Sequence, residues 1–357
     1  MQLADFRKIP GLISWRPVLF SELCHDQRSI RILRFSVGVT LSVALAHGIN
    51  WPLSFLLPVF TSVFLALPLP APSIRQGLTN MMQTLLAFVI GIVFNLVFLP
   101  YPLVYIPMLG LMLFNIYYYM NRGGSFWLVL MLLLAVLIVP MMGTVNEALA
   151  LGFAEGFVLS GIITVLMIWL AYGLFPVLDE VKSRPKKTRF QPGYSRPAAL
   201  LAIKSTAAVL PIALFFISFN LTGQLLVMVN AAIFSLSPDV VKGRQAGVKA
   251  VVTTLAGGAA AWIFYYVLIV VPEFYFLVAL MLLTTMLFAM LIFSGRPRAS
   301  YYGSAFVALV ILVNSSLSAG SDFSANFFWR VIFITLATVY VVVALRMLEH
   351  FWPNKVR

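Results

Sequence analysis

The strongest constraint on the fold of this chain is an internal repeat. Residues 62–91 and 232–261 align without a gap at a constant numbering offset of 170. The matching pairs are Arg34 and Lys204, Phe64 and Phe234, Pro68 and Pro238, Gly77 and Gly247, and Thr84–Leu85 and Thr254–Leu255. At an offset of 175, Ser125 pairs with Ser300 and Phe126–Trp127 with Tyr301–Tyr302. The sequence therefore predicts one structural unit built twice, a plan common among transporters.

Both copies are too apolar for a water-soluble domain. Hydrophobic residues make up 62% of the chain and charged residues 10%, whereas soluble domains are about 25% charged. A helix crosses a bilayer with about 20 apolar residues. Uncharged or nearly uncharged stretches supply two such helices in each of 35–74 and 76–121, and one in each of 123–146, 148–176, 198–218, 223–238, 250–271, 274–294, 299–317 and 326–346. We predict an all-α membrane protein of about twelve transmembrane helices, arranged as two parallel six-helix repeats.

Turn residues and charges divide the chain into five parts. The segments Asn50–Trp51–Pro52, Pro100–Tyr101–Pro102 and Asn220–Leu221–Thr222–Gly223 are typical of turns between spans. We expect a cytoplasmic N-terminal segment at 1–29, a first six-helix membrane repeat at 30–178, a basic cytoplasmic linker at 179–197, a second six-helix membrane repeat at 198–349 and a cytoplasmic tail at 350–357.

The distribution of cations predicts the orientation. Lysine and arginine concentrate in the cytoplasmic loops of membrane proteins. With the N-terminus inside, all 24 of these residues except Arg330 fall in cytoplasmic segments or at their edges. The outside loops carry the acids Glu147, Glu273 and Asp322. We predict a multi-pass protein of the inner (cytoplasmic) membrane with both termini in the cytoplasm.

The net charge of +13 follows mainly from this topology. The basic run of the linker, from Lys182 to Arg196, would suit a nucleic acid. Anionic lipid headgroups explain it better, because such clusters commonly lie against the cytoplasmic leaflet. The lipid bilayer is therefore an expected partner, and we expect no nucleic acid.

Motifs of enzymes are missing from the sequence. It contains no GxxxxGK[ST] phosphate loop and no HExxH zinc motif. The three histidines are scattered, and the one cysteine supports neither a disulfide nor a cysteine-based metal site. We expect no enzymatic activity, no cofactor and no metal.

Two ionisable residues inside predicted spans are the first candidate site. Glu155 and Arg330 occupy matching positions of the two copies, and Asn326 lies one turn before Arg330. A charge deep in a span costs about 2.5–3.5 kcal/mol on insertion scales. Gly152, Gly156 and Ser160 form a stripe along which another helix can pack, so we expect the neighbouring Glu155 to face protein or a polar cavity.

Three interpretations of this pair remain open. In the first, Arg330 attracts an anionic substrate and Glu155 titrates during proton-coupled export. In the second, the two residues form a structural ion pair between the copies. In the third, both lie near the outer interface and extend their charged ends to water.

Two basic turns are the second candidate site. Arg75 and Gln76 precede Gly77 at the start of the third predicted span. The corresponding turn of the second copy carries Asp239, Lys242, Arg244 and Gln245. A helix N-terminus with nearby cations favours anions, so these turns could form a cytoplasmic substrate vestibule. Anchoring of cations at the cytoplasmic face explains them as well and is the interpretation we favour.

Other polar and proline positions have plain structural interpretations. His47, at the outer end of the first span, could sense pH, but a structural role at the interface is favoured. Asn314 and other span asparagines could line a path or bond between helices. Pro58 and Pro211 lie inside predicted spans, where proline breaks a helical hydrogen bond. Tyr117–Tyr118–Tyr119 has the composition of an interfacial aromatic belt.

The chain resembles the fusaric acid resistance protein-like group of aromatic acid exporters. The resemblance rests on the cation that opens the first span of each copy (Arg34, Lys204), the proline-bearing second span, the short basic turn, and a third span rich in Thr and Gly (Thr84 and Gly91; Thr254, Gly257 and Gly258). Family members have a six-span block that is often followed by a sizeable cytosolic region. Here a second six-span block follows instead.

The resemblance implies an inner-membrane exporter of aromatic or other amphipathic organic acids that works with a periplasmic adaptor (membrane fusion) protein. Our first hypothesis is therefore a secondary efflux transporter of small organic anions, driven by the proton gradient. A passive anion channel and a non-transporting membrane scaffold subunit are the alternatives. A homo-oligomer is compatible with each of them.

Overall fold

A computed structural model describes most of the membrane-embedded part of the chain. The described residues are 27–51, 53–67, 73–176, 193–221, 228, 232, 235–236, 240–296, 298–319 and 323–351. In helices near the end of the chain, the side chains of 240–247, 315–316, 318–319, 323–326, 330, 337–338, 345 and 348–351 are not among the described parts. The expected N-terminal segment, most of the linker and most of the tail lie outside the described residues.

All regular elements in these ranges are α-helices. They are α2 (Gln27–Gly48), α3 (Leu56–Ala66), α4 (Ile74–Phe98), α5 (Pro102–Asn121), α6 (Phe126–Gly143), α7 (Glu147–Leu174), α8 (Arg196–Ser218), α10 (Val240–Val270), α11 (Phe274–Ile292), α12 (Ala299–Ala319) and α13 (Phe323–Phe351). Within the described residues, nine of these helices contain a segment long and apolar enough to cross a bilayer. The protein is an all-helical, multi-pass membrane protein whose outer face contacts lipid.

The second predicted span is shorter than expected. Helix α3 has 11 residues, about 16 Å at 1.5 Å per residue, against roughly 30 Å of hydrocarbon. Because α3 begins at Leu56, Pro58 lies in its first turn, where a backbone N–H has no helical partner in any case. The expectation of a broken hydrogen bond at Pro58 is therefore wrong, whereas Pro211 does lie inside α8.

Two turns at the ends of α2 and α8 have the same backbone geometry. Asn50 and Asn220, which are paired at the numbering offset of 170, are the non-glycine residues with positive φ among those described, at 52° and 55°. In the first turn, Trp51 N–H bonds to Ala46 O at 2.9 Å, and in the second, Leu221 N–H bonds to Phe216 O at 3.1 Å. Asparagine tolerates this left-handed conformation better than most residues, so both predicted turns are confirmed at these positions.

Small residues let certain helices approach closely. An ideal Cβ at Gly91 of α4 would lie 2.8 Å from the Cβ of Ala135 in α6. In the second half, a Cβ at Gly257 of α10 would meet the carbonyl oxygen of Ala305 in α12. Close backbone approach is a main source of helix association in lipid, where apolar burial gives little driving force.

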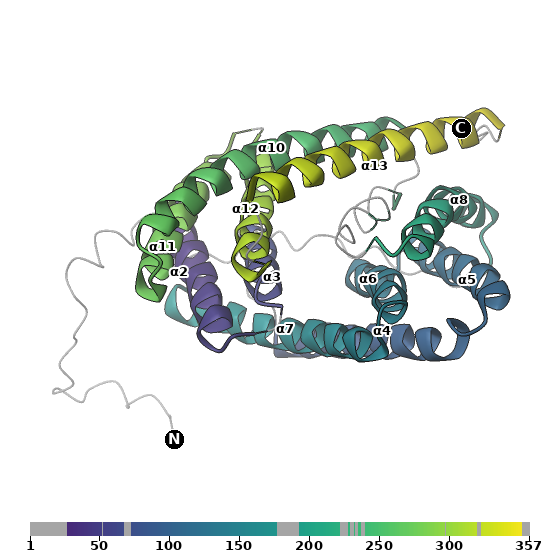
Figure 1. The fold of residues 1–357 in the computed structure, drawn as a ribbon, viewed down its shortest axis with the longest axis horizontal. Helices are drawn as coiled ribbons and strands as arrows, with labels where there is room; N and C mark the ends of the chain where they lie inside the picture. Colours follow the sequence, from purple (N-terminus) through teal and green to yellow (C-terminus); the bar gives the residue numbers. More distant parts are fainter. Residues whose placement is uncertain are drawn as a thin grey trace, which may run out of the picture.

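The helices of the two halves pack on one another reciprocally. Helix α2 packs against α11, and α5 packs against α8, so each pair joins a helix before the linker to one after it. In Figure 1, α4 and α7 run along one long side of the molecule, and α10 and α13 run together along the opposite side. The remaining helices lie between these two sides. The helices before the linker and those after it therefore do not form two separate groups, because they pack on one another.

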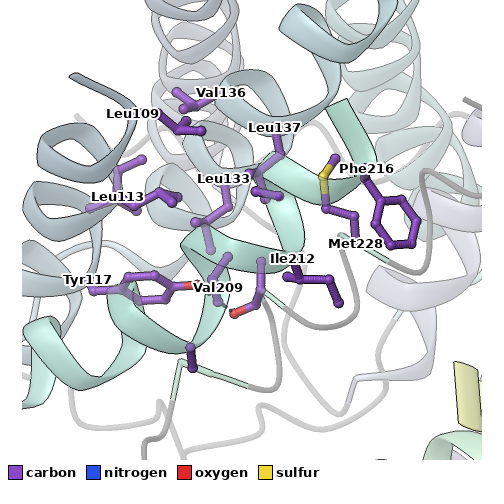
Figure 2. Close-up of a cluster of buried hydrophobic side chains, with 14 of the residues drawn as sticks. Leu109, Leu113, Tyr117, Leu133, Val136, Leu137, Val209, Ile212, Phe216 and Met228 are labelled. Atoms are coloured by element: carbon purple, nitrogen blue, oxygen red, sulfur yellow. Dashed lines mark hydrogen bonds between the residues drawn. The ribbon is translucent and has the colours of Figure 1, made fainter. Parts of the chain in front are cut away.

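Buried apolar side chains from both halves form the interior. One cluster joins α5, α6 and α8, with Leu109, Leu133 and Val209 completely buried or nearly so (Figure 2). Tyr117 belongs to this cluster, and its hydroxyl donates to the backbone carbonyl of Ala232 at 2.9 Å. The interfacial-belt interpretation is therefore wrong for Tyr117, because its ring is 1% exposed.

We expect Gly91→Ala to weaken the packing of α4 on α6. The new methyl group would also lie 3.1 Å from the backbone of Ala135, so a helix must move, at a cost of about 1–3 kcal/mol. Gly152→Ala is the matched control, since a Cβ there has nothing within 4 Å. Thermal unfolding in detergent micelles measures both. Equal unfolding temperatures for the two variants would contradict the close contact.

Candidate functional site

Glu155 lies on an exposed stripe of α7. Its side chain is exposed, as are Gly152 and Leu159, one turn to either side. The two other small residues of the predicted stripe face inward: Gly156 contacts Leu53, and the fully buried Ser160 accepts a hydrogen bond from Trp51 Nε1 at 3.0 Å. The turn before α3 therefore packs on Gly156 and Ser160, and Glu155 lies outside this contact.

The partners proposed for Glu155 belong to α13. Asn326 and Arg330 are both within this helix, but their side chains are outside the described parts of the structure. An ion pair between Glu155 and Arg330 thus stays a prediction. The exposed carboxylate of Glu155 leaves each of the three interpretations open.

Both basic turns lie at the start of a helix, as expected. Arg75 and Gln76 are exposed in the first turn of α4, and the Ser73 hydroxyl accepts a hydrogen bond from the Gln76 backbone N–H at 3.3 Å. Lys242, Arg244 and Gln245 lie near the start of α10, with their side chains outside the description, and Asp239 lies outside the described residues. The cytoplasmic vestibule remains a prediction.

The cation that opens the first span has a defined structural role. Arg34 is 6% exposed, and its guanidinium lies 4.0 Å from the centre of the Tyr172 ring. It also donates from Nη1 to the carbonyl of Phe175 at 3.4 Å, at the end of α7. A cation is favourable at a helix C-terminus and over an aromatic face. Lys204, at the equivalent position of α8, is 5% exposed.

A pocket with two polar residues lies where the halves meet. Helices α2 and α3 line it from one half, and α10, α11 and α12 line it from the other. It is a narrow space with room for about one water molecule, it is partly open to the surroundings, and its walls are mainly apolar. The polar members are His47 and Asn314. The Asn314 Oδ1 accepts a hydrogen bond from the Ser54 hydroxyl.

In the sequence, His47 and Asn314 are two separate polar positions with no motif that connects them. They belong to different halves and to different predicted spans. No spacing rule connects residues on α2 and α12, because only the packing of one half on the other brings them together. The signal that the sequence offered for this site was one polar residue in each of the two predicted spans.

We expect Arg34→Met to destabilise the protein by about 2 kcal/mol, the combined scale of a buried cation–π contact and a helix C-terminal charge. Arg34→Lys restores the charge without the planar group and should recover part of the loss. The exposed Arg196, at the start of α8, supplies the control Arg196→Met. Thermal unfolding of the three variants tests this, and equal effects at Arg34 and Arg196 would contradict it.

Comparison with known proteins gives one family similarity. A family described as a protein of unknown function (DUF2955) matches residues 31–171. The match runs from α2 to α7 and leaves the second half of the chain unmatched. No curated protein and no solved structure matches the chain. The similarity therefore concerns the first six described helices and carries no activity with it.

Proposed function

We propose that this protein is a secondary efflux transporter of the inner membrane that exports aromatic or other amphipathic organic acids. In this proposal, twelve spans form two parallel six-helix repeats, and both termini lie in the cytoplasm. Proton movement drives export. A periplasmic adaptor protein receives the substrate, because the predicted outer loops are too short to bridge a periplasm.

Correspondence between the halves is the observation that carries the proposal. The turns at Asn50 and Asn220, equivalent positions of the repeat, have matching hydrogen bonds. Helices α4 and α6 pack together in the first half, as α10 and α12 do in the second. The family similarity over 31–171 also agrees closely with the first repeat, predicted at 30–178.

Duplicated bundles suit transport because the interface between them can change. In many transporters, repeats rock against one another around a substrate site at their interface. Here the reciprocal contacts of α2 with α11 and of α5 with α8 supply such an interface. This argument supports a transporter over a scaffold, which has no need of movement between its halves.

Glu155 is the residue we propose for proton coupling. It is an ionisable side chain inside an apolar span, and intramembrane carboxylates commonly take part in proton relays. Its exposed position on α7 would allow it to reach a water-filled path. Arg330 and Asn326 would supply the complementary charge and hydrogen bonds for an anionic substrate.

Glu155→Gln should abolish export that depends on a pH gradient, because glutamine does not titrate. The measurement is accumulation of labelled aromatic acids in cells with and without the protein, at two external pH values and equal protein levels. The control is Glu147→Gln, an exposed acid in the first turn of the same helix. This variant should export normally.

The same assay separates the alternatives. A passive anion channel predicts flux that ignores the pH gradient and survives Glu155→Gln. A non-transporting scaffold predicts the same accumulation with and without the protein. Either result would remove the proposed transport mechanism.

A further inference from the structure

A line of polar side chains follows the contact between α2 and α11. The hydroxyl oxygens of Thr40 and Thr285 are 3.2 Å apart across this contact, and both residues are buried. Ser36, one turn before Thr40 in α2, is also buried, and its hydroxyl has no hydrogen-bond partner among the described residues. Hydrogen bonding between helices explains the threonine pair but leaves the Ser36 hydroxyl unexplained.

The narrow space at His47 and Asn314 lies further along the same contact, toward the His47 end of α2. Val43 and Met281 line it, each one helical turn beyond a member of the threonine pair. It has room for about one water molecule, and His47 and Asn314 are its polar residues. Room and polar partners are the two conditions for a bound water.

His47 is the ionisable residue among those that line this space. Helices α3 and α12 contain no charged residue, and the cations of α10 lie near its start, far along the helix from Phe264, which lines the space. On α11, the exposed Glu273 directly precedes Phe274, whose ring lies close to Gly48. The imidazole of His47 is therefore the group that can exchange protons with a water molecule here.

The equivalent contact between α5 and α8 is apolar at the positions of the threonine pair. At the offsets of the repeat, Thr40 corresponds to Leu210 and Thr285 to Gly110. These counterparts also meet, since a Cβ at Gly110 would lie 3.4 Å from Leu210 Cδ2. Ser36 corresponds to Thr206, so the two contacts differ from Thr40 onward.

The polar residues of the narrow space have apolar counterparts as well. His47 corresponds to Ile217 and Asn314 to Val139. The fold therefore joins two such helices without these polar groups, and burying a polar group costs free energy unless it is hydrogen-bonded. A role beyond joining helices would explain why they are concentrated at one of two equivalent contacts.

We propose that the α2–α11 contact is a proton path between the halves, in which a water molecule held by His47 and Asn314 passes protons to the hydroxyl pair of Thr40 and Thr285. His47 takes up a proton on one ring nitrogen and releases one from the other. Water and hydroxyl groups both donate and accept hydrogen bonds, so each accepts one proton and gives up another. The net change is the movement of one proton.

This proposal rests on the proposed function, since it gives the proton that drives export a route between the halves. Glu155 is not part of the path, because it lies on the exposed stripe of α7. The two sets of residues can therefore be tested separately.

Val43 and Met281 close the path in this structure. They separate the water-sized space from the threonine pair by one helical turn, about 5 Å, and both are buried apolar residues. Apolar constrictions exclude water and so act as gates. A coupled transporter requires such a gate, because a continuous path would dissipate the proton gradient. A hydroxyl group introduced at Val43 should bridge the gap.

The test is proton entry into liposomes that contain the purified full-length protein. A trapped pH-sensitive dye follows entry after the outside is acidified, with the membrane potential held at zero. Val43→Ser should raise the initial rate at least threefold over that of the unaltered protein. Val209→Ser is the matched control, since it makes the same change at a buried valine of α8 in the cluster with α5, and should leave the rate unchanged.

Second substitutions show whether the additional protons use the proposed path. Adding Thr40→Val to Val43→Ser should return the rate to that of the unaltered protein, and so should adding His47→Ile together with Asn314→Val. Adding Thr164→Val should not, since Thr164 is a buried threonine of α7 that bonds within its own helix. A leak caused by disturbed packing would persist in every combination.

An unchanged rate in Val43→Ser, an equal increase in Val209→Ser, or an increase that survives Thr40→Val would overturn the path. Export that depends on the pH gradient in cells would then leave the exporter intact. The expected liposome results without export in cells would overturn the proposed function and leave the proton path.

Discussion

Close packing of one helix on another holds this protein together. In a bilayer, burying a leucine against another helix gains little over leaving it in lipid, so association relies on packing and on interhelical hydrogen bonds. Gly91 brings α4 onto Ala135 of α6, and Thr40 bonds to Thr285 across α2 and α11. Such contacts hold each half together and join the halves. These helix contacts also determine where the buried polar side chains lie relative to one another.

Polar groups inside this packing are mostly paired within the protein. Trp51 bonds to Ser160, Ser54 bonds to Asn314, and Arg34 lies on Tyr172. Each pairing joins segments distant in sequence, as expected where unpaired polar groups are costly. His47 and Asn314, from different halves, line one small space among these contacts.

Local rules predicted the helical class, the turns and most helix positions. Long apolar stretches must be helical in lipid. The turn residues Asn50, Pro100 and Asn220 mark where one helix ends and the next begins. The same rules misjudged Pro58, because the place of a proline within a helix depends on where that helix begins. They also misjudged Tyr117, which has an interfacial composition yet reaches the carbonyl of Ala232 inside the cluster. Glu155 was identified as unusual, but its exposure depends on which face of α7 meets the turn before α3.

Composition alone is enough to identify a membrane protein of many helices, because a chain with 62% hydrophobic residues cannot stay in water as a folded domain of this size. The two constant numbering offsets also match residues of the first half with residues of the second half. The packing of α2 on α11 and of α5 on α8, and the meeting of His47 and Asn314 at one small space, depend on how the helices are arranged in three dimensions. The physical reason is that a repeat states which residues are equivalent, whereas contact depends on how two such units approach each other in space.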